Sequence, residues 1–144
     1  RPLPKRTNIV VSRGFDAPEG VVVVSSLEEA YKAVFSAVSD GSETSPSRLF
    51  VIGGGQIYAQ AMQDADRLII THVHTAIEDA DTFFPKIDPN TWQCVSEEHH
   101  EADEKHLYPY TFAEYIKKCH TEGYLCLDIK PDNIFVIRYF PLYF

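Results

Sequence analysis

The sequence is poor in cysteine, in basic residues and in long apolar runs, and each shortage excludes a class of protein. Three cysteines in 144 residues, with no CxxC pair, exclude a disulfide scaffold and predict reduced thiols in a cytoplasmic protein. No apolar run approaches the roughly 20 residues of a membrane span, and no apolar leader opens the sequence, so we expect no membrane partner. Thirteen Lys and Arg against twenty-one Asp and Glu give a net charge of −8, which argues against nucleic-acid binding.

The remaining composition is that of a globular protein. Hydrophobic residues make up 44% of the chain and charged residues 24%. The length fits one domain, and we expect a monomer. The sequence starts with Arg1 and not with Met, so we also expect a fragment, the later part of a longer protein.

Charge is distributed unevenly along the chain. Residues 1–13 contain Arg1, Lys5, Arg6 and Arg13 and no Asp or Glu. Residues 78–104, in contrast, are rich in Asp and Glu and contain only one Lys or Arg, Lys86. A cationic start on an acidic protein suits a small anionic ligand, because the Arg side chain matches carboxylate and phosphate oxygens. A solvated basic segment explains the same composition equally well.

Apolar patterns predict an α/β fold with a mostly parallel sheet. Ser26 and Glu29 have the spacing of a capping box, which predicts a helix from about residue 27 to 38. A second helix is expected from about residue 56. Short β-branched or alternating runs predict strands at residues 7–12, 20–24, 49–52, 67–73, 92–98 and 110–116.

Three consecutive glycines, Gly53, Gly54 and Gly55, join a predicted strand to the second helix. Glycine lets backbone approach a ligand closely, and a helix N-terminus favours an anion such as phosphate. The run is neither a GxGxxG fingerprint nor a Walker loop. A simple packing turn between strand and helix remains the alternative.

Several ordered motifs resemble dihydrofolate reductase. They are RPLPxR at residue 1, the VVS strand, VIGGGQIY, IITHVH, DTFFP and YPYTFAEYIKK, which ends at Lys118. Within the family, these motifs most resemble those of the fungal members. The resemblance implies an α/β fold with flanking helices and an antiparallel C-terminal hairpin, without the N-terminal strand and helix. It also implies NADPH-dependent reduction of 7,8-dihydrofolate to tetrahydrofolate.

The resemblance assigns substrate roles to matching positions. Arg6 would pair with the α-carboxylate of the folate glutamate, Arg1 would lie near the same tail, and Leu3 would pack on the benzoyl ring. Ile52 would touch the pterin. Thr71 would hydrogen-bond the catalytic carboxylate and a water, although without the family it is an ordinary strand residue.

It assigns cofactor roles as well. Ser12 and Arg13 would contact the 2′-phosphate of NADPH, and Ser25 and Leu27 would line the adenosine end. A cis peptide bond is expected between Gly53 and Gly54. The pyrophosphate and nicotinamide ribose would lie on Gly53, Gly54, Gly55, Gln56, Ile57 and Tyr58.

The family's catalytic acid, first strand and mobile loop lie upstream of the RPLP motif and have no counterpart here. Asp79 and Asp81, after a strand, match no proton-donating position, and His99, His100 and His106 are expected in or beside a polar hairpin loop. We therefore expect the isolated chain to be poorly active or inactive, with unpaired sheet edges that favour aggregation. A non-catalytic, truncated NADPH-binding fragment or a mispredicted gene model is the alternative.

Residues 119–144 are expected to form a tail unrelated to the domain of residues 1–118. The segment from about 120 to 136 looks like a protein-kinase catalytic loop, with Asp128, Lys130 and Asn133 at the matching positions. Cys126 and Leu127 depart from that pattern, and the other kinase motifs are missing. A fusion of two exons is the preferred explanation, and an accidental motif in an apolar tail is the alternative.

Overall fold

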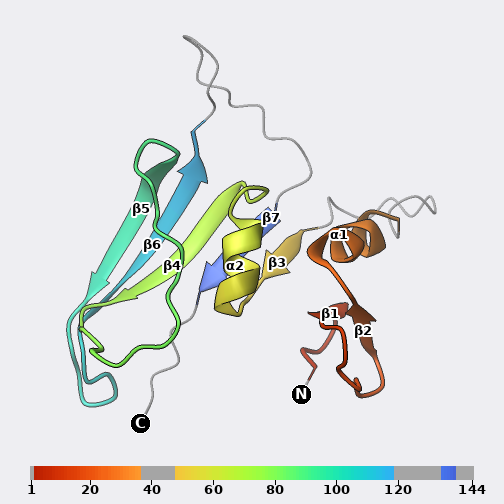
Figure 1. The fold of residues 1–144 in the computed structure, drawn as a ribbon. Coiled ribbons are helices and arrows are strands. Elements are labelled where there is room, and N and C mark those ends of the chain that lie inside the picture. Colours follow the sequence, from red (N-terminus) through yellow and green to blue (C-terminus); the bar gives the residue numbers. More distant parts are fainter. Residues whose placement is uncertain (1, 37–47, 119–133, 139–144) are drawn as a thin grey trace. The chain divides into compact units, whose positions relative to one another are not determined.

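The computed structural model describes residues 2–36, 48–118 and 134–138, which fall into two compact units (Figure 1). Unit 1 covers Arg1–Ser47 and unit 2 covers Arg48–Phe144. Arg1, Asp128, Lys130 and Asn133 lie outside the described residues. Each unit is described here by itself.

Unit 1 contains two parallel strands and one helix. Strand β1, Asn8–Val11, pairs with β2, Val21–Val24, and helix α1, Leu27–Ser36, packs against both strands. Gly20 supplies a positive φ of 83° in the turn that leads into β2. An apolar strand such as β2 is usually buried, but Val22 and Val23 are 42% and 38% exposed. Among the described residues, β1 and β2 pair only with each other, and α1 is the helix that packs against them.

Unit 2 is built on a five-stranded sheet of order β3-β7-β4-β6-β5 (Figure 1). β3, β7 and β4 are parallel, β6 pairs antiparallel with β4, and β5 pairs antiparallel with β6. The sequence predicts a mostly parallel sheet with an antiparallel end, but without β7. Helix α2, Gly55–Ala61, follows β3 and packs against it. The strands are β3 (Leu49–Val51), β4 (Arg67–Val73), β5 (Trp92–His100), β6 (Tyr110–Lys117) and β7 (Ile134–Arg138).

His99 and His100 are the last residues of β5, beside the hairpin loop, and His106 lies in that loop, as expected. One expectation for this unit needs correction. The facing edges of β3 and β4 are not unpaired, because β7, from the tail, lies between them and pairs with both. Since β7 follows the last expected strand, the sequence patterns did not predict it.

Strand register divides the sheet into a core face and a more open face. In-register residues of neighbouring strands share a face, and successive residues of one strand alternate between faces. The core face carries the buried residues Val51, Leu68, Ile70, Trp92 and Ala113. The open face carries Phe50, Ile69, Thr71 and Phe112, of which Phe50 and Phe112 are 44% and 43% exposed.

In the part of the chain that the structure describes, no helix has both the length and the apolar character that crossing a bilayer requires.

Candidate functional site

The carboxyl ends of the parallel strands in unit 2 bring two predicted site segments to one edge. The glycine turn, Gly53–Gly55, directly follows β3, and Thr71 lies near the end of β4. β7 separates these two strands, so the turn and Thr71 are two strand spacings apart across the sheet, roughly 10 Å. Ligands of open α/β sheets bind at this edge.

The backbone of the glycine turn has a conformation that few other residues could adopt. Gly53 has a φ of 115°, in the region that side chains with a Cβ rarely enter. A Cβ on Gly53 would also lie 3.2 Å from the hydroxyl of Tyr58. The peptide bond between Gly53 and Gly54 is cis, which confirms the prediction drawn from the family resemblance.

The loop that carries the DTFFP motif braces this turn. A Cβ on Gly55 would lie 2.6 Å from Cγ2 of Thr82, so only glycine fits beneath that side chain. The rings of Tyr58 and Phe84 meet edge to face, with centroids 5.0 Å apart. The sequence reasoning used this motif to recognise the family but gave Thr82 and Phe84 no role, because their contact partners are distant in sequence.

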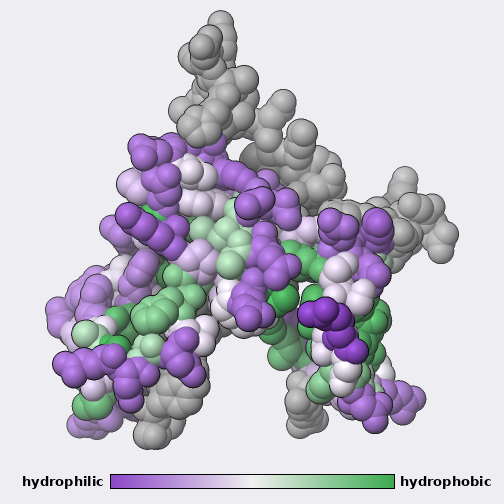
Figure 2. All heavy atoms as spheres, viewed as in Figure 1, coloured by the Kyte–Doolittle hydropathy of each residue, from purple (hydrophilic) through white to green (hydrophobic). Residues whose placement is uncertain are grey.

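Thr71 lies on the open face beside apolar side chains. It is half-buried and pairs in register with Phe112 of β6. Ile52, two residues after Phe50 and directly before the glycine turn, is 62% exposed. Figure 2 shows that apolar side chains reach the surface among polar ones. An exposed isoleucine and a half-buried threonine hydroxyl suit a flat, partly polar ring system.

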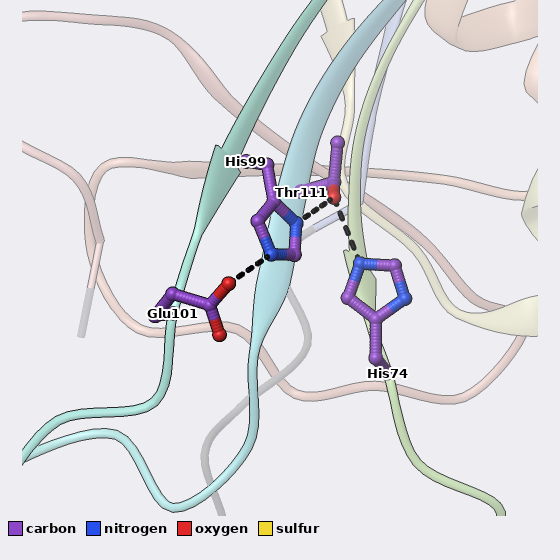
Figure 3. A network of polar contacts seen from close by, with 4 residues as sticks. All are labelled: His74, His99, Glu101 and Thr111. Carbon is purple, nitrogen blue, oxygen red and sulfur yellow. Dashed lines mark hydrogen bonds and ion pairs between the residues drawn. The ribbon is translucent and has the colours of Figure 1, made fainter.

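A polar network lies on the core face of the sheet, opposite to the face of Thr71 and near the end of β4 (Figure 3). Nε2 of His74 is 2.8 Å, and Nδ1 of His99 is 3.1 Å, from the same Thr111 hydroxyl oxygen. The second nitrogen of His99 is 3.3 Å from Glu101. A hydroxyl has one proton, so at least one imidazole must donate to it. The network ties β4, β5 and β6 together where β4 ends.

Unit 1 gathers the predicted 2′-phosphate and adenosine residues at its own carboxyl edge. The N–H of Ser12 donates to the carbonyl of Val24 at 2.9 Å and extends the ladder by one bond. Ser12 and Ser25 therefore leave adjacent parallel strands side by side, with exposed Arg13 following Ser12. Leu27 is buried at the start of α1, so its side chain is little exposed to a ligand.

Glu29 binds back to this edge. Its backbone N–H donates to Oγ of Ser26 at 3.2 Å, as the capping box predicts. Its carboxylate, however, accepts the N–H and the hydroxyl of Ser25, at 2.8 and 2.9 Å. These two hydrogen bonds hold the pKa of Glu29 below its ordinary value. A ligand that needs the Ser25 donors has to displace this carboxylate.

Asn8 organises the RPLPxR segment. Its Oδ1 accepts the N–H of Leu3 at 2.8 Å, and its Nδ2 donates to the carbonyls of Leu3 and Arg6, at 2.9 and 3.1 Å. The turn places Lys5 at a φ of 60° and leaves Arg6 exposed. No sequence pattern gave Asn8 a role, and its hydrogen bonds make it a positioning residue for Leu3 and Arg6.

The chemistry of these residues suits an organic anion. Among the described residues, no group of three or more His, Cys, Asp or Glu side chains is placed to hold a metal ion. The glycine turn offers the exposed backbone of Gly54, and unit 1 offers the exposed cation of Arg13, which directly follows Ser12. Such groups bind phosphate oxygens.

Comparison with known proteins identifies relatives of the chain. A family model described as Dihydrofolate reductase matches residues 1–117. The dihydrofolate reductase of Bacillus subtilis is 40% identical over 119 residues, which cover 82% of this chain and 65% of that protein. That of Haemophilus influenzae is 39% identical over 112 residues, 78% of this chain and 64% of that protein.

A solved structure shares the fold. Dihydrofolate reductase from Enterococcus faecalis, complexed with NADP(H) and RAB-propyl, superposes with a TM-score of 0.61 and 36% identity, over 83% of this chain and 66% of that one. The chain thus spans just under two thirds of the length of each of these relatives. All three are bacterial and lend no support to a fungal character.

Proposed function

We propose that this chain carries the cofactor- and substrate-binding residues of a dihydrofolate reductase, since the chain belongs to the dihydrofolate reductase family. The reaction is the NADPH-dependent reduction of 7,8-dihydrofolate to tetrahydrofolate. The glycine turn is the observation that carries this proposal, because the positive φ of Gly53 and the Thr82 methyl group beside Gly55 leave room there only for residues without a Cβ.

For NADPH we propose residues in each unit, taken separately. Arg13 and Ser12 would take the 2′-phosphate, and Ser25 would face the adenosine end once Glu29 releases it. Gly53–Gly55 and the first turn of α2, Gln56–Tyr58, would take the pyrophosphate and the nicotinamide ribose. When bound, NADPH supplies the hydride. The exposure of Arg13 and of Gly54 supports these assignments.

For dihydrofolate we likewise propose residues within each unit, taken separately. Ile52 and Thr71 would face the pterin, which fits the exposure of Ile52 at the edge of the sheet. Leu3, 45% exposed, would pack on the benzoyl ring, and Arg6 would grip the glutamate α-carboxylate. Arg1 would lie near the same carboxylate. The Asn8 hydrogen bonds support this arrangement, because they hold Leu3 and Arg6 in one turn.

The proton for the pterin has no assigned donor in this chain. Asp79 and Asp81 are exposed in the loop after β4, and neither matches the position of the family's acid. A positioned acid contributes about 10²–10⁴ in rate, so we propose slow turnover or none for the isolated chain. The second candidate function is therefore NADPH binding without turnover. We further propose a cytoplasmic monomer, and we assign no activity to the kinase-like residues 120–136.

Dihydrofolate-dependent oxidation of NADPH, followed by absorbance, separates the two candidates. We expect dihydrofolate to bind to the NADPH-loaded chain and turnover at neutral pH to stay near the uncatalysed rate. Any residual rate should rise as the pH falls, because solvent then supplies the proton. Fast turnover at neutral pH would contradict the missing acid, and a failure of dihydrofolate to bind would contradict the reductase assignment.

A further inference from the structure

Strand β7 lies in the middle of the parallel part of the sheet. Phe135 is in register with Phe50 of β3 on one side and with Arg67 of β4 on the other. Val136 is likewise flanked by Val51 and Leu68. Both edges of this five-residue strand are therefore used for pairing, and both ladders are parallel.

The strand comes from outside the family match, which ends at residue 117. Among the described residues, β7 is the only strand partner of β3. Residues within the match thus supply two facing strand edges, and the strand that joins them comes from the tail. Without β7, no ladder connects β3, and the glycine turn that follows it, to β4.

The topology lets the tail of the same chain reach this position. Arg67, the first residue of β4, is in register with Ile116 of β6 on one side and with Phe135 of β7 on the other. The end of β6 and the start of β7 therefore lie at the same edge of the sheet, roughly 10 Å apart. An extended residue spans about 3.3 Å, so residues 118–133 have ample length for this connection.

The residue types also fit. Ile134–Arg138 reads IFVIR, a β-branched and aromatic run. Strands with parallel partners on both sides typically have such near-continuous apolar sequences.

We infer that the facing edges of β3 and β4 form a strand-accepting site for an extended, β-branched peptide in parallel orientation, and that this chain's own tail segment Ile134–Arg138 is its occupant. The tail strand then fixes the register of β3 relative to β4. It thereby fixes the position of the glycine turn relative to Thr71, so it is a positioning element of the candidate site. The inference needs neither NADPH nor folate to be the ligand, and its tests use neither.

Register-specific cross-linking of the full chain tests the occupant. In a background with the three native cysteines changed to Ser, Phe50→Cys with Phe135→Cys should form a disulfide within one chain on mild oxidation. Phe50→Cys with Ile137→Cys is the matched control on the same face. Its Cα atoms would be roughly 8 Å apart, beyond disulfide reach. Equal cross-linking of both pairs, or cross-links only between chains, would overturn the assignment.

Hydrogen exchange of the full chain tests the site itself. Val136→Pro removes a ladder donor, and we expect β3 and β4 amides that face β7 to exchange about tenfold faster or more, while β5–β6 amides stay protected. Val136→Ile should change nothing. Adding the peptide NIFVIRY, residues 133–139, to the Val136→Pro chain should restore protection, and NIFPIRY should not. Unchanged exchange in Val136→Pro, or no response to the peptide, would contradict the inference.

Discussion

At the scale of single residues, the candidate site depends on atoms that are missing as much as on side chains that are present. Gly55 has no Cβ, and the space a Cβ would take is closed by one methyl group, Cγ2 of Thr82. The next atom, the carbonyl oxygen of Phe83, is at an ordinary 3.5 Å. The steric conflict is thus confined to one pair of residues and can be tested as a pair.

Gly55→Ala should destabilise unit 2 by about 1–3 kcal/mol, the usual cost of overpacking, and should weaken NADPH binding. Thr82→Ser removes only Cγ2 and keeps the hydroxyl. We expect the double variant Gly55→Ala/Thr82→Ser to recover most of the lost stability in urea denaturation. If the double variant is as unstable as Gly55→Ala alone, the brace described here is wrong.

Arg13 should determine the preference for the phosphorylated cofactor. Charge-assisted hydrogen bonds contribute about 1.5–3 kcal/mol, so Arg13→Gln should weaken NADPH binding by roughly 10- to 100-fold and leave NADH binding nearly unchanged. Lys5→Gln is the matched control, because Lys5 is an exposed cation of the same unit with no assigned role. Calorimetric titration of both variants with both cofactors is the measurement. An equal loss for NADPH and NADH would rule out this role.

At the scale of elements, the N-terminus of α1 carries a pH dependence. The carboxylate of Glu29 accepts two hydrogen bonds from Ser25, which lowers its pKa below the ordinary value of 4.5. A lowered carboxyl pKa stabilises the fold above the unfolded-state value, and the stabilisation is lost as the pH falls through the folded-state value. The helix start is therefore firmest at neutral pH.

Glu29→Gln should lower the urea midpoint of unit 1 at pH 7, and the difference from the wild type should shrink and disappear as the pH falls below the ordinary carboxyl pKa and through the lowered pKa of Glu29. Glu28→Gln is the matched control, because it removes the same charge from the same helical turn. Circular dichroism of the helix at several pH values measures both. A Glu29→Gln deficit that persists at low pH would show that the hydrogen-bonded carboxylate is not its cause.

The element scale also shows where sequence patterns succeed. β4 was predicted at residues 67–73 and found there, because seven residues rich in β-branched side chains and bounded by polar ones leave little ambiguity. β5 was predicted to end at residue 98 and extends to His100. The capping box was found as well, but its carboxylate binds Ser25 and not Ser26, a one-residue difference that no pattern encodes.

At the scale of the whole molecule, the family and its cis glycine bond followed from motif order, whereas the arrangement of strands did not. Periodicity identifies a strand but not its neighbours, so the insertion of β7 between β3 and β4 could not be predicted from IFVIR alone. The Thr82 brace was missed for the same reason. The division into two units depends on which strands pair, and β1 and β2 pair only with each other in the described residues.

The central proposal is that this chain binds NADPH. Calorimetric titration of the full chain with NADPH tests it most directly, with NADH as the comparison and the fluorescence of buried Trp92 as the check that unit 2 is folded. The account predicts saturable one-to-one binding of NADPH, at least about tenfold tighter than that of NADH. A folded chain that shows no saturable binding of NADPH would contradict it.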